Sequence, residues 1–385
     1  MKYRKFGKLD WNSSALGFGA MRLPVIGADR SNIDEALAIR MIRYAIDHGV
    51  NYVDTGYRYH NGASERVVGK ALRDGYREKV RLATKMPVRL LESTEDLDRI
   101  FRDQLGKLQT DHLDFYLLHG LRASTWPKVR DFEVLSWAEQ QMADGRIGHL
   151  GFSFHDEFAL FKEIIDSYEG WTFCQIQYNY VDTAYQAGTR GLRYAAAQGL
   201  AVVVMEPIQG GNLAFPPPKE IQTIWDEASV TRTPAEWALQ WVWDQPEVSL
   251  ALSGMSTMDH VVENLQHADR SGVGILTAEE LSLIARVREK YLTSGLVGCT
   301  GCRYCVPCPE GVAIPDILTY GNTAYTKLGD PSARQAVIAE YEATIPSEER
   351  IEACVRCGEC EEKCPQHLPV PDVLRRATKY LRRDR

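Results

Sequence analysis

The sequence predicts an α/β protein, a closed barrel of eight parallel strands with surrounding helices, followed by a small, mainly α-helical domain. Short apolar segments recur through roughly the first 270 residues, and segments with helical periodicity separate them. Eight such repeats match a closed parallel barrel better than an open doubly wound sheet, which would bring a dinucleotide fingerprint. Beyond the repeats, eight of the nine cysteines gather between residues 299 and 364, which predicts a separate domain with its own chemistry.

Composition limits the classes of function. The chain has 385 residues, 44% of them hydrophobic and 25% charged, which suffices for one large core and a small second one. A formal net charge of -7 argues against nucleic acid as a partner. The first residues lack the apolar stretch of a secretory signal, and no apolar run approaches ~18 residues, so we expect a cytoplasmic protein with no membrane partner.

The individual elements follow in order. A short hairpin is expected over residues 3–14. The eight expected strands are 15–18, 51–54, 80–84, 113–118, 149–153, 173–178, 201–205 and 249–252. The expected helices are 33–47, 64–73, 94–108, 132–143, 157–168, 191–197, 234–244 and 259–268. We therefore expect a barrel over residues 1–275, a linker helix within 276–296 and a second domain over 297–385.

Polar residues stand where the expected strands end, at Asp54, Lys85, His119, Ser153 and Gln175, and Tyr59 follows in the loop after Asp54. Each of them alone has a simpler interpretation, such as a solvated lysine or a satisfied core histidine. In a parallel barrel the carboxyl ends of all strands meet at one face, so together these residues predict an active site.

This set of side chains can deliver a proton to a carbonyl oxygen. A tyrosine with a free pKa of ~10 is a weak acid, but a nearby ammonium favours the phenolate and lowers that pKa. Asp54 would hold Lys85 charged and oriented, and a neutral His119 could donate a hydrogen bond to the substrate oxygen. A hydride is still missing, because no side chain supplies one.

The residues resemble the aldo-keto reductase family. The resemblance covers roughly residues 1–270. It includes Asp54 within Val53-Asp54-Thr55, then Tyr59, Ser64-Glu65 and Gly69, and its catalytic tetrad would be Asp54, Tyr59, Lys85 and His119. It implies a TIM barrel that reduces a carbonyl substrate, an aldehyde or a ketone, with NADPH or NADH, and Tyr59 as the general acid.

The same resemblance implies the nucleotide contacts. Ser153 and Gln175 would hold the nicotinamide carboxamide. A loop over the pyrophosphate would contain Glu206, Gly210, Gly211 and Leu213, a loop at the adenosine-side phosphate would contain Ser253 and Met255, and Glu263 and Asn264 would contact adenine. Glycine-rich loops at helix starts also suit phosphate physically.

Three positions depart from the family pattern. Phe154 replaces an asparagine, Met205 replaces an aromatic residue that stacks on nicotinamide, and His260 replaces an arginine that grips a 2′-phosphate. The choice between NADPH and NADH therefore stays open, as does a site that uses no nicotinamide.

The cysteine spacing is that of iron-sulfur proteins. The second segment, Cys354, Cys357, Cys360 and Cys364-Pro365, has the full ferredoxin spacing, in which the fourth cysteine ligates the neighbouring cluster. One [4Fe-4S] cluster would then be bound by Cys299, Cys302, Cys305 and Cys364. The other would be bound by Cys308, Cys354, Cys357 and Cys360. The alternative, two structural zinc sites, is disfavoured because zinc ribbons use separated cysteine pairs.

Between the two cysteine segments, expected helices at 315–325 and 332–341 resemble the α-helical ferredoxin domains. The ninth cysteine, Cys174, lies in an expected strand and is interpreted as a small core residue.

Three hypotheses for function remain. The first is an iron-sulfur aldo-keto reductase that uses NAD(P)H and is coupled to the two clusters, with a redox partner protein as one destination for their electrons. The second is a reductase fed by the clusters, in which the tetrad only delivers protons. The third is an electron-transfer subunit with an inactive barrel. The sequence leaves open the natural substrate, the direction and route of electron flow, and the oligomeric state.

Overall fold

The computed structural model describes residues 1–27 and 29–382, which form two compact units. The first unit contains Met1–Pro207 and Leu239–Ile275. The second contains Ile208–Ala238 and everything described from Leu276 onward. The two units are therefore interleaved along the chain, because Ile208–Ala238 leaves the first unit and groups with the carboxyl-terminal part.

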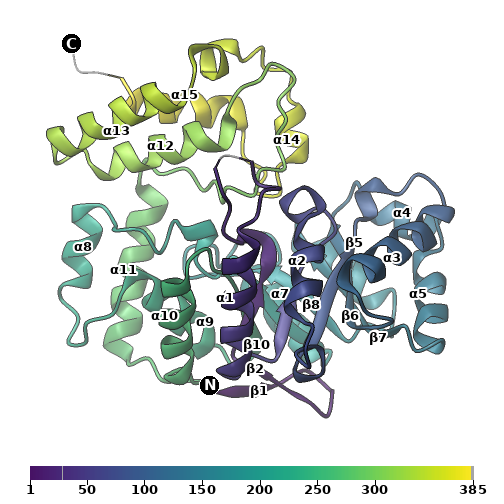
Figure 1. The fold of residues 1–385 in the computed structure, drawn as a ribbon. Coiled ribbons are helices and arrows are strands. Elements are labelled where there is room, and N and C mark those ends of the chain that lie inside the picture. The colour runs from purple at the N-terminus through teal and green to yellow at the C-terminus, as the bar shows by residue number, and fades with distance from the viewer. Residues whose placement is uncertain (28, 383–385) are drawn as a thin grey trace. The chain divides into compact units, whose positions relative to one another are not determined.

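The first unit is a closed barrel of parallel strands, in the order β10-β3-β4-β5-β6-β7-β8-β9 (Figure 1). The strands are β3 Leu16–Gly19, β4 Tyr52–Asp54, β5 Arg81–Met86, β6 Leu113–Leu121, β7 Ile147–Phe154, β8 Phe173–Gln177, β9 Ala201–Met205 and β10 Val248–Gly254. All eight expected strands are confirmed within a few residues. Neighbouring strands pair in parallel, for example Phe18 with Val53 and Val53 with Leu82, so their carboxyl ends lie at one face.

Helices alternate with the strands as the apolar periodicity predicts. They are α1 Glu35–Asp47, α2 Ser64–Ala71, α3 Glu95–Leu108, α4 Trp126–Asp131, α5 Val134–Ala143, α6 Phe158–Asp166, α7 Gly188–Ala197, α9 Pro234–Asp244 and α10 Met258–Asp269. Helix α1 starts with a side-chain cap, because the Asp34 carboxylate accepts a hydrogen bond from the Leu37 N–H at 3.0 Å.

The amino-terminal hairpin closes one end of the barrel. Strands β1 Tyr3–Lys5 and β2 Asn12–Ser14 pair antiparallel, and the turn between them carries the fully buried Phe6. The Phe6 ring packs on Phe115 with centroids 4.9 Å apart and on Trp11 at 5.3 Å. The hairpin joins the apolar layer at the amino ends of the strands, which leaves the opposite mouth for polar chemistry.

The second unit is helical. Its helices are α8 Lys219–Trp225, α11 Ala278–Thr293, α12 Ile314–Thr326, α13 Pro331–Thr344, α14 Glu359–Lys363 and α15 Val370–Tyr380. Helix α11 starts with a capping box in which Thr277 and Glu280 satisfy each other's backbone N–H groups. Helices α12 and α15 cross closely, because a Cβ on Gly321 would lie 2.5 Å from the Cβ of Ala377.

The insertion Ile208–Ala238 is tied to α11. Arg286 of α11 makes two hydrogen bonds to Glu227, at 2.6 and 2.7 Å, and Arg232 pairs with Glu280. The expected linker helix is therefore present as α11, and it packs on α8. Helices α4, α8 and α14 are short, and the periodicity of the sequence does not reveal them.

Candidate active site and cluster ligands

Asp54 and Lys85 form a buried ion pair at the ends of β4 and β5. Asp54 is 1% exposed and Lys85 is fully buried. The Lys85 ammonium donates to Asp54 and, at 2.7 Å, to the carbonyl oxygen of Thr55. Burial raises the pKa of Asp54 and lowers the pKa of Lys85, and the opposite charge of each partner opposes both changes.

A polar network behind β5 holds Lys85 in place. The side-chain amide of Gln104 donates to the carbonyl oxygen of Lys85 at 3.0 Å and to the Glu65 carboxylate at 2.9 Å. Thr84 also donates to Glu65, at 2.7 Å, and the Tyr116 hydroxyl donates to Gln104 at 2.6 Å. Because all these groups are buried, the network orients the strand end that carries the lysine.

Tyr59 lies against the ion pair. The Lys85 nitrogen is 4.9 Å from the centroid of the Tyr59 ring, and the ring, which is 9% exposed, follows Asp54 on the same loop. The next residue, His60, has a φ of 52°, a strained value for a side chain of this size. Its ring accepts a hydrogen bond from the Leu23 N–H at 3.1 Å and contacts the Arg30 carbonyl at 2.7 Å. His60 therefore anchors the loop that carries Tyr59, a role that no pattern in the sequence indicated.

His119 completes the group of four side chains. Its ring meets the Tyr59 ring edge-on, with centroids 5.8 Å apart and an angle of 83° between the planes. Burial of the imidazole away from water holds the pKa of His119 well below 6.5. The positive charges of nearby side chains lower this pKa further; these are Lys85, His155, Arg58 and Arg122. The imidazole is therefore neutral at pH 7. The structure brings Asp54, Tyr59, Lys85 and His119 together, as the strand-end argument expected.

Ser153 and Gln175, the expected nicotinamide contacts, lie at the ends of neighbouring strands. Ser153 pairs with Gln175 in the register of β7 and β8, and each is 1% exposed. The Ser153 hydroxyl accepts a hydrogen bond from the Gly120 N–H at 2.7 Å. The Gln175 amide donates to the Asp54 carboxylate at 3.4 Å. Gln175 thus connects the expected nicotinamide position to the ion pair.

The other barrel residues with expected nucleotide roles are more dispersed. Glu206 has a φ of 54° and lies 3.7 Å from Arg22 in an ion pair, and its carbonyl oxygen accepts from Asn179 at 3.1 Å. Asn264 donates to the Ser253 hydroxyl at 3.2 Å. Met255 is buried, whereas Glu263 is exposed on α10.

Gly210, Gly211 and Leu213 belong to the second unit. Both glycines have positive φ, 69° and 109°, and Leu213 is fully buried. Gly211 lies in the 3-10 turn Gln209–Gly211, whose backbone N–H and carbonyl groups bond within the turn. The structure therefore divides the expected nucleotide contacts between the two compact units.

Of the three departures from the family pattern, Phe154 has a clear structural role. Its ring is fully buried and packs on Phe161 of α6, with centroids 5.0 Å apart. It therefore fills the layer between the strands and the helices. His260 is exposed on α10, and its ring approaches the Ser256 hydroxyl at 3.4 Å.

The first four expected cluster ligands lie near one another. Burial raises the pKa of Cys305 to about 12, and the neighbouring thiols of Cys302, Cys299 and Cys364 add to the effect. Cys302, Cys299 and Cys364 therefore all lie close enough to Cys305 for a charge on any of them to disfavour ionisation of its thiol. Four thiols in reach of one another are the donor set that a [4Fe-4S] cluster requires.

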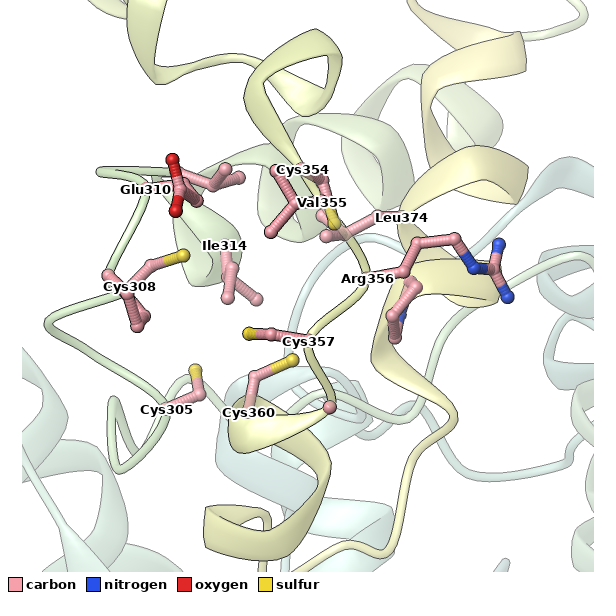
Figure 2. Close-up of a pocket in the computed structure, with 14 residues that line it drawn as sticks. Cys305, Cys308, Glu310, Ile314, Cys354, Val355, Arg356, Cys357, Cys360 and Leu374 are labelled. Carbon is pink, nitrogen blue, oxygen red and sulfur yellow. The ribbon is translucent and has the colours of Figure 1, made fainter.

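The second four thiols surround a cavity (Figure 2). Cys308, Cys354, Cys357 and Cys360 line it, and their sulfur atoms are turned toward the space between them, beside the apolar side chains of Ile314 and Leu374. Burial raises the pKa of Cys360 to about 11. Cys305 lines the same cavity, so the two ligand sets adjoin at this residue. The apolar wall and the four thiols fit a cluster.

Each cysteine segment is fixed by an arginine. Arg303 pairs with Asp316 through two hydrogen bonds, at 2.7 and 2.8 Å, and Arg356 pairs with Asp372 at 2.9 Å. Both aspartates belong to a Pro-Asp sequence at the start of a helix, and five residues separate that sequence from the preceding Cys-Pro pair in both halves. This internal repeat of the two aspartates was visible in the sequence, whereas the two arginines occupy different positions in their cysteine segments.

The cysteine loops also repeat their backbone conformation. Gly301 and Arg303 have φ of 62° and 64° in the first loop, and Arg356 and Gly358 have 60° and 85° in the second. Left-handed positions of this kind turn successive N–H groups to one side, where they can face an anionic cluster. Within residues 1–27 and 29–382, no three histidine, cysteine or acidic side chains are arranged to hold a single metal ion.

Comparisons with known proteins find two consecutive family matches along the chain. The model of the aldo/keto reductase family matches residues 15–288, and the model of a 4Fe-4S dicluster domain matches residues 298–368. An uncharacterized oxidoreductase of Bacillus subtilis, YrpG, is 27% identical over 235 residues, which is 55% of this chain and 68% of YrpG.

Solved structures show the same fold. The holo form of the aldo-keto reductase AKR11C1 from Bacillus halodurans is 28% identical and superposes with a TM-score of 0.62, over 74% of this chain and 96% of that one. An aldo-keto reductase from Klebsiella pneumoniae, solved in complex with NADPH, is 26% identical with a TM-score of 0.59, over 74% and 95%. In the described part of the chain, no helix combines the length and apolar character needed to cross a bilayer.

Proposed function

The chain belongs to the aldo/keto reductase family and carries a 4Fe-4S dicluster domain, and we propose that it reduces a small-molecule aldehyde or ketone. Tyr59 donates the proton to the carbonyl oxygen, a nicotinamide cofactor supplies the hydride, and the product is an alcohol. The two clusters exchange electrons with a redox partner protein.

The observation that carries this proposal is the position of the Lys85 ammonium between Asp54 and Tyr59. The nitrogen is bound to the Asp54 carboxylate and lies 4.9 Å from the centroid of the Tyr59 ring. A fixed positive charge beside a phenol stabilises the phenolate that remains after proton transfer. Because Lys85 is fully buried, its charge acts in a low dielectric, where it is worth more than in water.

His119 supports the same step from the other side of Tyr59. A neutral imidazole can donate one hydrogen bond, and its lowered pKa keeps it neutral through the physiological range. The substrate oxygen would then be held by two donors, the Tyr59 hydroxyl and the His119 ring. Two fixed donors stabilise the negative charge that develops on that oxygen.

The charges around His119 favour an anionic substrate. Arg58, Arg122 and His155 all lie close enough to lower the pKa of His119, and they follow β4, β6 and β7 at the same mouth. A carbonyl compound with a carboxylate or phosphate group would be attracted to this mouth. We expect a higher kcat/KM for such compounds than for neutral aldehydes of equal size.

For the nucleotide, Ser153 and Gln175 would hold the carboxamide of the nicotinamide ring. The Klebsiella relative with bound NADPH supports this assignment, as do the burial of both side chains and the hydrogen bond from Gln175 to Asp54. The sequence departures at Met205 and His260 leave the preference between NADPH and NADH to experiment.

The test compares wild-type protein with Tyr59→Phe, both purified without oxygen. We expect the variant to keep its brown colour and its affinity for NADPH but to lose at least 100-fold in kcat for carbonyl reduction. Unchanged turnover in the variant would refute the acid role of Tyr59. Wild-type protein that binds neither NADPH nor NADH would refute the hydride source.

A second candidate function follows from the altered positions. In a reductase fed by the clusters, Tyr59 would still deliver protons, while single electrons from the ferredoxin-like domain replace the hydride. This candidate predicts turnover with dithionite as the only reductant, and the first candidate predicts none.

A further inference from the structure

The turn after β9 lies directly on the first cysteine segment. The Asn212 side-chain amide donates a hydrogen bond to the carbonyl oxygen of Cys299 at 3.0 Å. A Cβ added at Gly210 would lie 2.5 Å from both the Cα and the carbonyl oxygen of Thr300. Gly210 and Asn212 lie in the segment that the resemblance to the aldo-keto reductases assigns to the pyrophosphate of the nucleotide.

This contact demands particular residues on both sides. The close approach leaves room for glycine alone at position 210, where the φ of 69° also favours glycine. Thr300 is 2% exposed, so it cannot move outward into solvent without losing its packing. Asn212 supplies the donor for a carbonyl group that faces the loop.

The turn itself is rigid. The N–H groups of Gly211 and Leu213 both donate to the carbonyl oxygen of Ile208, at 3.0 and 3.2 Å, and the Asn212 N–H donates to Gln209 at 3.2 Å. The fully buried Leu213 fixes its far end. A displacement of this turn would therefore be transmitted to Cys299 and Thr300 instead of being absorbed within the loop.

The peptide between Cys299 and Thr300 is well placed to influence a cluster. Cys299 is an expected ligand, and Gly301 and Arg303, both with positive φ, follow it in the same cysteine segment. The potential of an iron-sulfur cluster depends on the hydrogen bonds and the solvent exposure around it. A hydrogen bond to the Cys299 carbonyl polarises this peptide and fixes its orientation.

We propose that Asn212 and Gly210 are positioning residues of the cluster bound by Cys299, and that nucleotide binding at their loop shifts the redox potential of that cluster. The nucleotide half of this inference rests on the proposed function, whereas the positioning half does not. Because linkage is reciprocal, reduction of the cluster must change nucleotide affinity by the same factor. For a one-electron cluster, a tenfold change in affinity corresponds to a shift of 59 mV.

The experiment is an anaerobic redox titration of the full-length holoprotein, in which electron paramagnetic resonance follows both clusters with and without NADP⁺. The variants Cys299→Ser and Cys354→Ser assign the two signals. We expect NADP⁺ to shift the potential of the Cys299 cluster alone, and Asn212→Leu to abolish that shift. In Asn212→Leu without nucleotide, this potential should already differ from that of the wild type, while the second cluster stays unchanged and confirms that the unit has folded.

Gly210→Ala and Gly211→Ala form a matched pair. The first places a methyl group against the Thr300 backbone, whereas a Cβ at Gly211 has its nearest neighbour, the Phe215 ring, at 3.5 Å. We expect Gly210→Ala to change the spectrum of the first cluster and Gly211→Ala to leave it unchanged. If both variants changed the spectrum of the first cluster equally, backbone strain in the loop would explain the change, and the positioning role of Gly210 would be overturned.

The outcomes separate this inference from the proposed function. If the wild type binds NADP⁺ and neither potential moves, the coupling is refuted while the proposed function stands. If it binds no nucleotide, the proposed function and the coupling both fail. In that case the positioning role is tested by the potential of the Cys299 cluster in Asn212→Leu without nucleotide. A potential equal to that of the wild type would refute the positioning role.

Discussion

Replacement of Asp54 by asparagine would leave Lys85 as a buried charge without a counter-charge. Lys85 is fully buried, and besides Asp54 its ammonium has a hydrogen bond to the Thr55 carbonyl at 2.7 Å. A neutral amide can accept one hydrogen bond but cannot balance the charge. Breaking a buried ion pair from one side costs about 3–5 kcal/mol, so we expect Asp54→Asn to lower the free energy of unfolding by that amount.

Removal of both charges should reverse most of this loss. Lys85→Met leaves the Asp54 carboxylate with the distant Gln175 amide, at 3.4 Å, and should cost a similar amount. The double variant Asp54→Asn/Lys85→Met has no buried charge at this position, and apolar replacement of buried pairs is often neutral or stabilising. The two single losses would sum to about 6–10 kcal/mol, whereas the double variant should lose less than about 2 kcal/mol.

Urea unfolding followed by tryptophan fluorescence measures these differences, because six of the eight tryptophans lie in the first unit. The wild type and the three variants are compared at pH 7 under anaerobic conditions. If the double variant lost as much free energy of unfolding as the two single variants together, the two charges would not depend on each other, and the coupling of Asp54 to Lys85 would be refuted. All three variants should be inactive, so activity cannot substitute for the stability measurement.

The remaining predictions concern packing, protonation and the clusters. Gly69→Ala puts a Cβ 2.5 Å from the Lys107 carbonyl oxygen and should lower the free energy of unfolding in urea by about 1–3 kcal/mol. In Gly106→Ala the added Cβ meets nothing within 4 Å, so this variant should raise the free energy of unfolding by about 0.5–1 kcal/mol. The reverse order of stabilities would contradict the packing of α2 on α3. Since the pKa of His119 lies well below 6.5, kcat should show no break near pH 6.5, and a break there that His119→Gln removes would disprove a neutral ring. The unfolded state takes up a proton near that pH and the folded state does not, so His119 should make the protein less stable as pH falls below 6.5. Cys360→Ser should release about half of the iron and leave the signal of the Cys299 cluster, and loss of both signals would contradict separate ligand sets.

Most of the barrel could be predicted from the sequence because each strand is a short apolar segment with a helix behind it. That local pattern places Asp54, Lys85 and His119 at strand ends, and the closure of the barrel brings the ends together. Spacing alone also separated the two sets of cysteines, which now lie near Cys305 and around the cavity at Cys360.

Features that depend on contacts between distant segments could not be predicted in this way. His60 follows Tyr59 directly, but its anchoring role depends on Leu23 and Arg30, which are brought close only by folding. The segment 208–238 belongs to the second unit because of contacts such as the hydrogen bond from Arg286 to Glu227, which joins positions far apart in the sequence. Neither feature produces a periodic pattern in the amino-acid sequence.

The interleaving of the two units has a consequence for biosynthesis. The ribosome completes the segment 208–238 before it adds any of the eight cysteines, and the chain returns to the first unit before α11 emerges. Until α11 arrives, α8 lacks the helix on which it packs, and of its buried side chains Trp225 can already stack on Trp237, with ring centroids 4.9 Å apart. A nascent or truncated chain that stops before α11 would therefore display a surface that chaperones and proteases recognise, so the cell could remove chains that lack the cluster domain before a barrel without clusters accumulates.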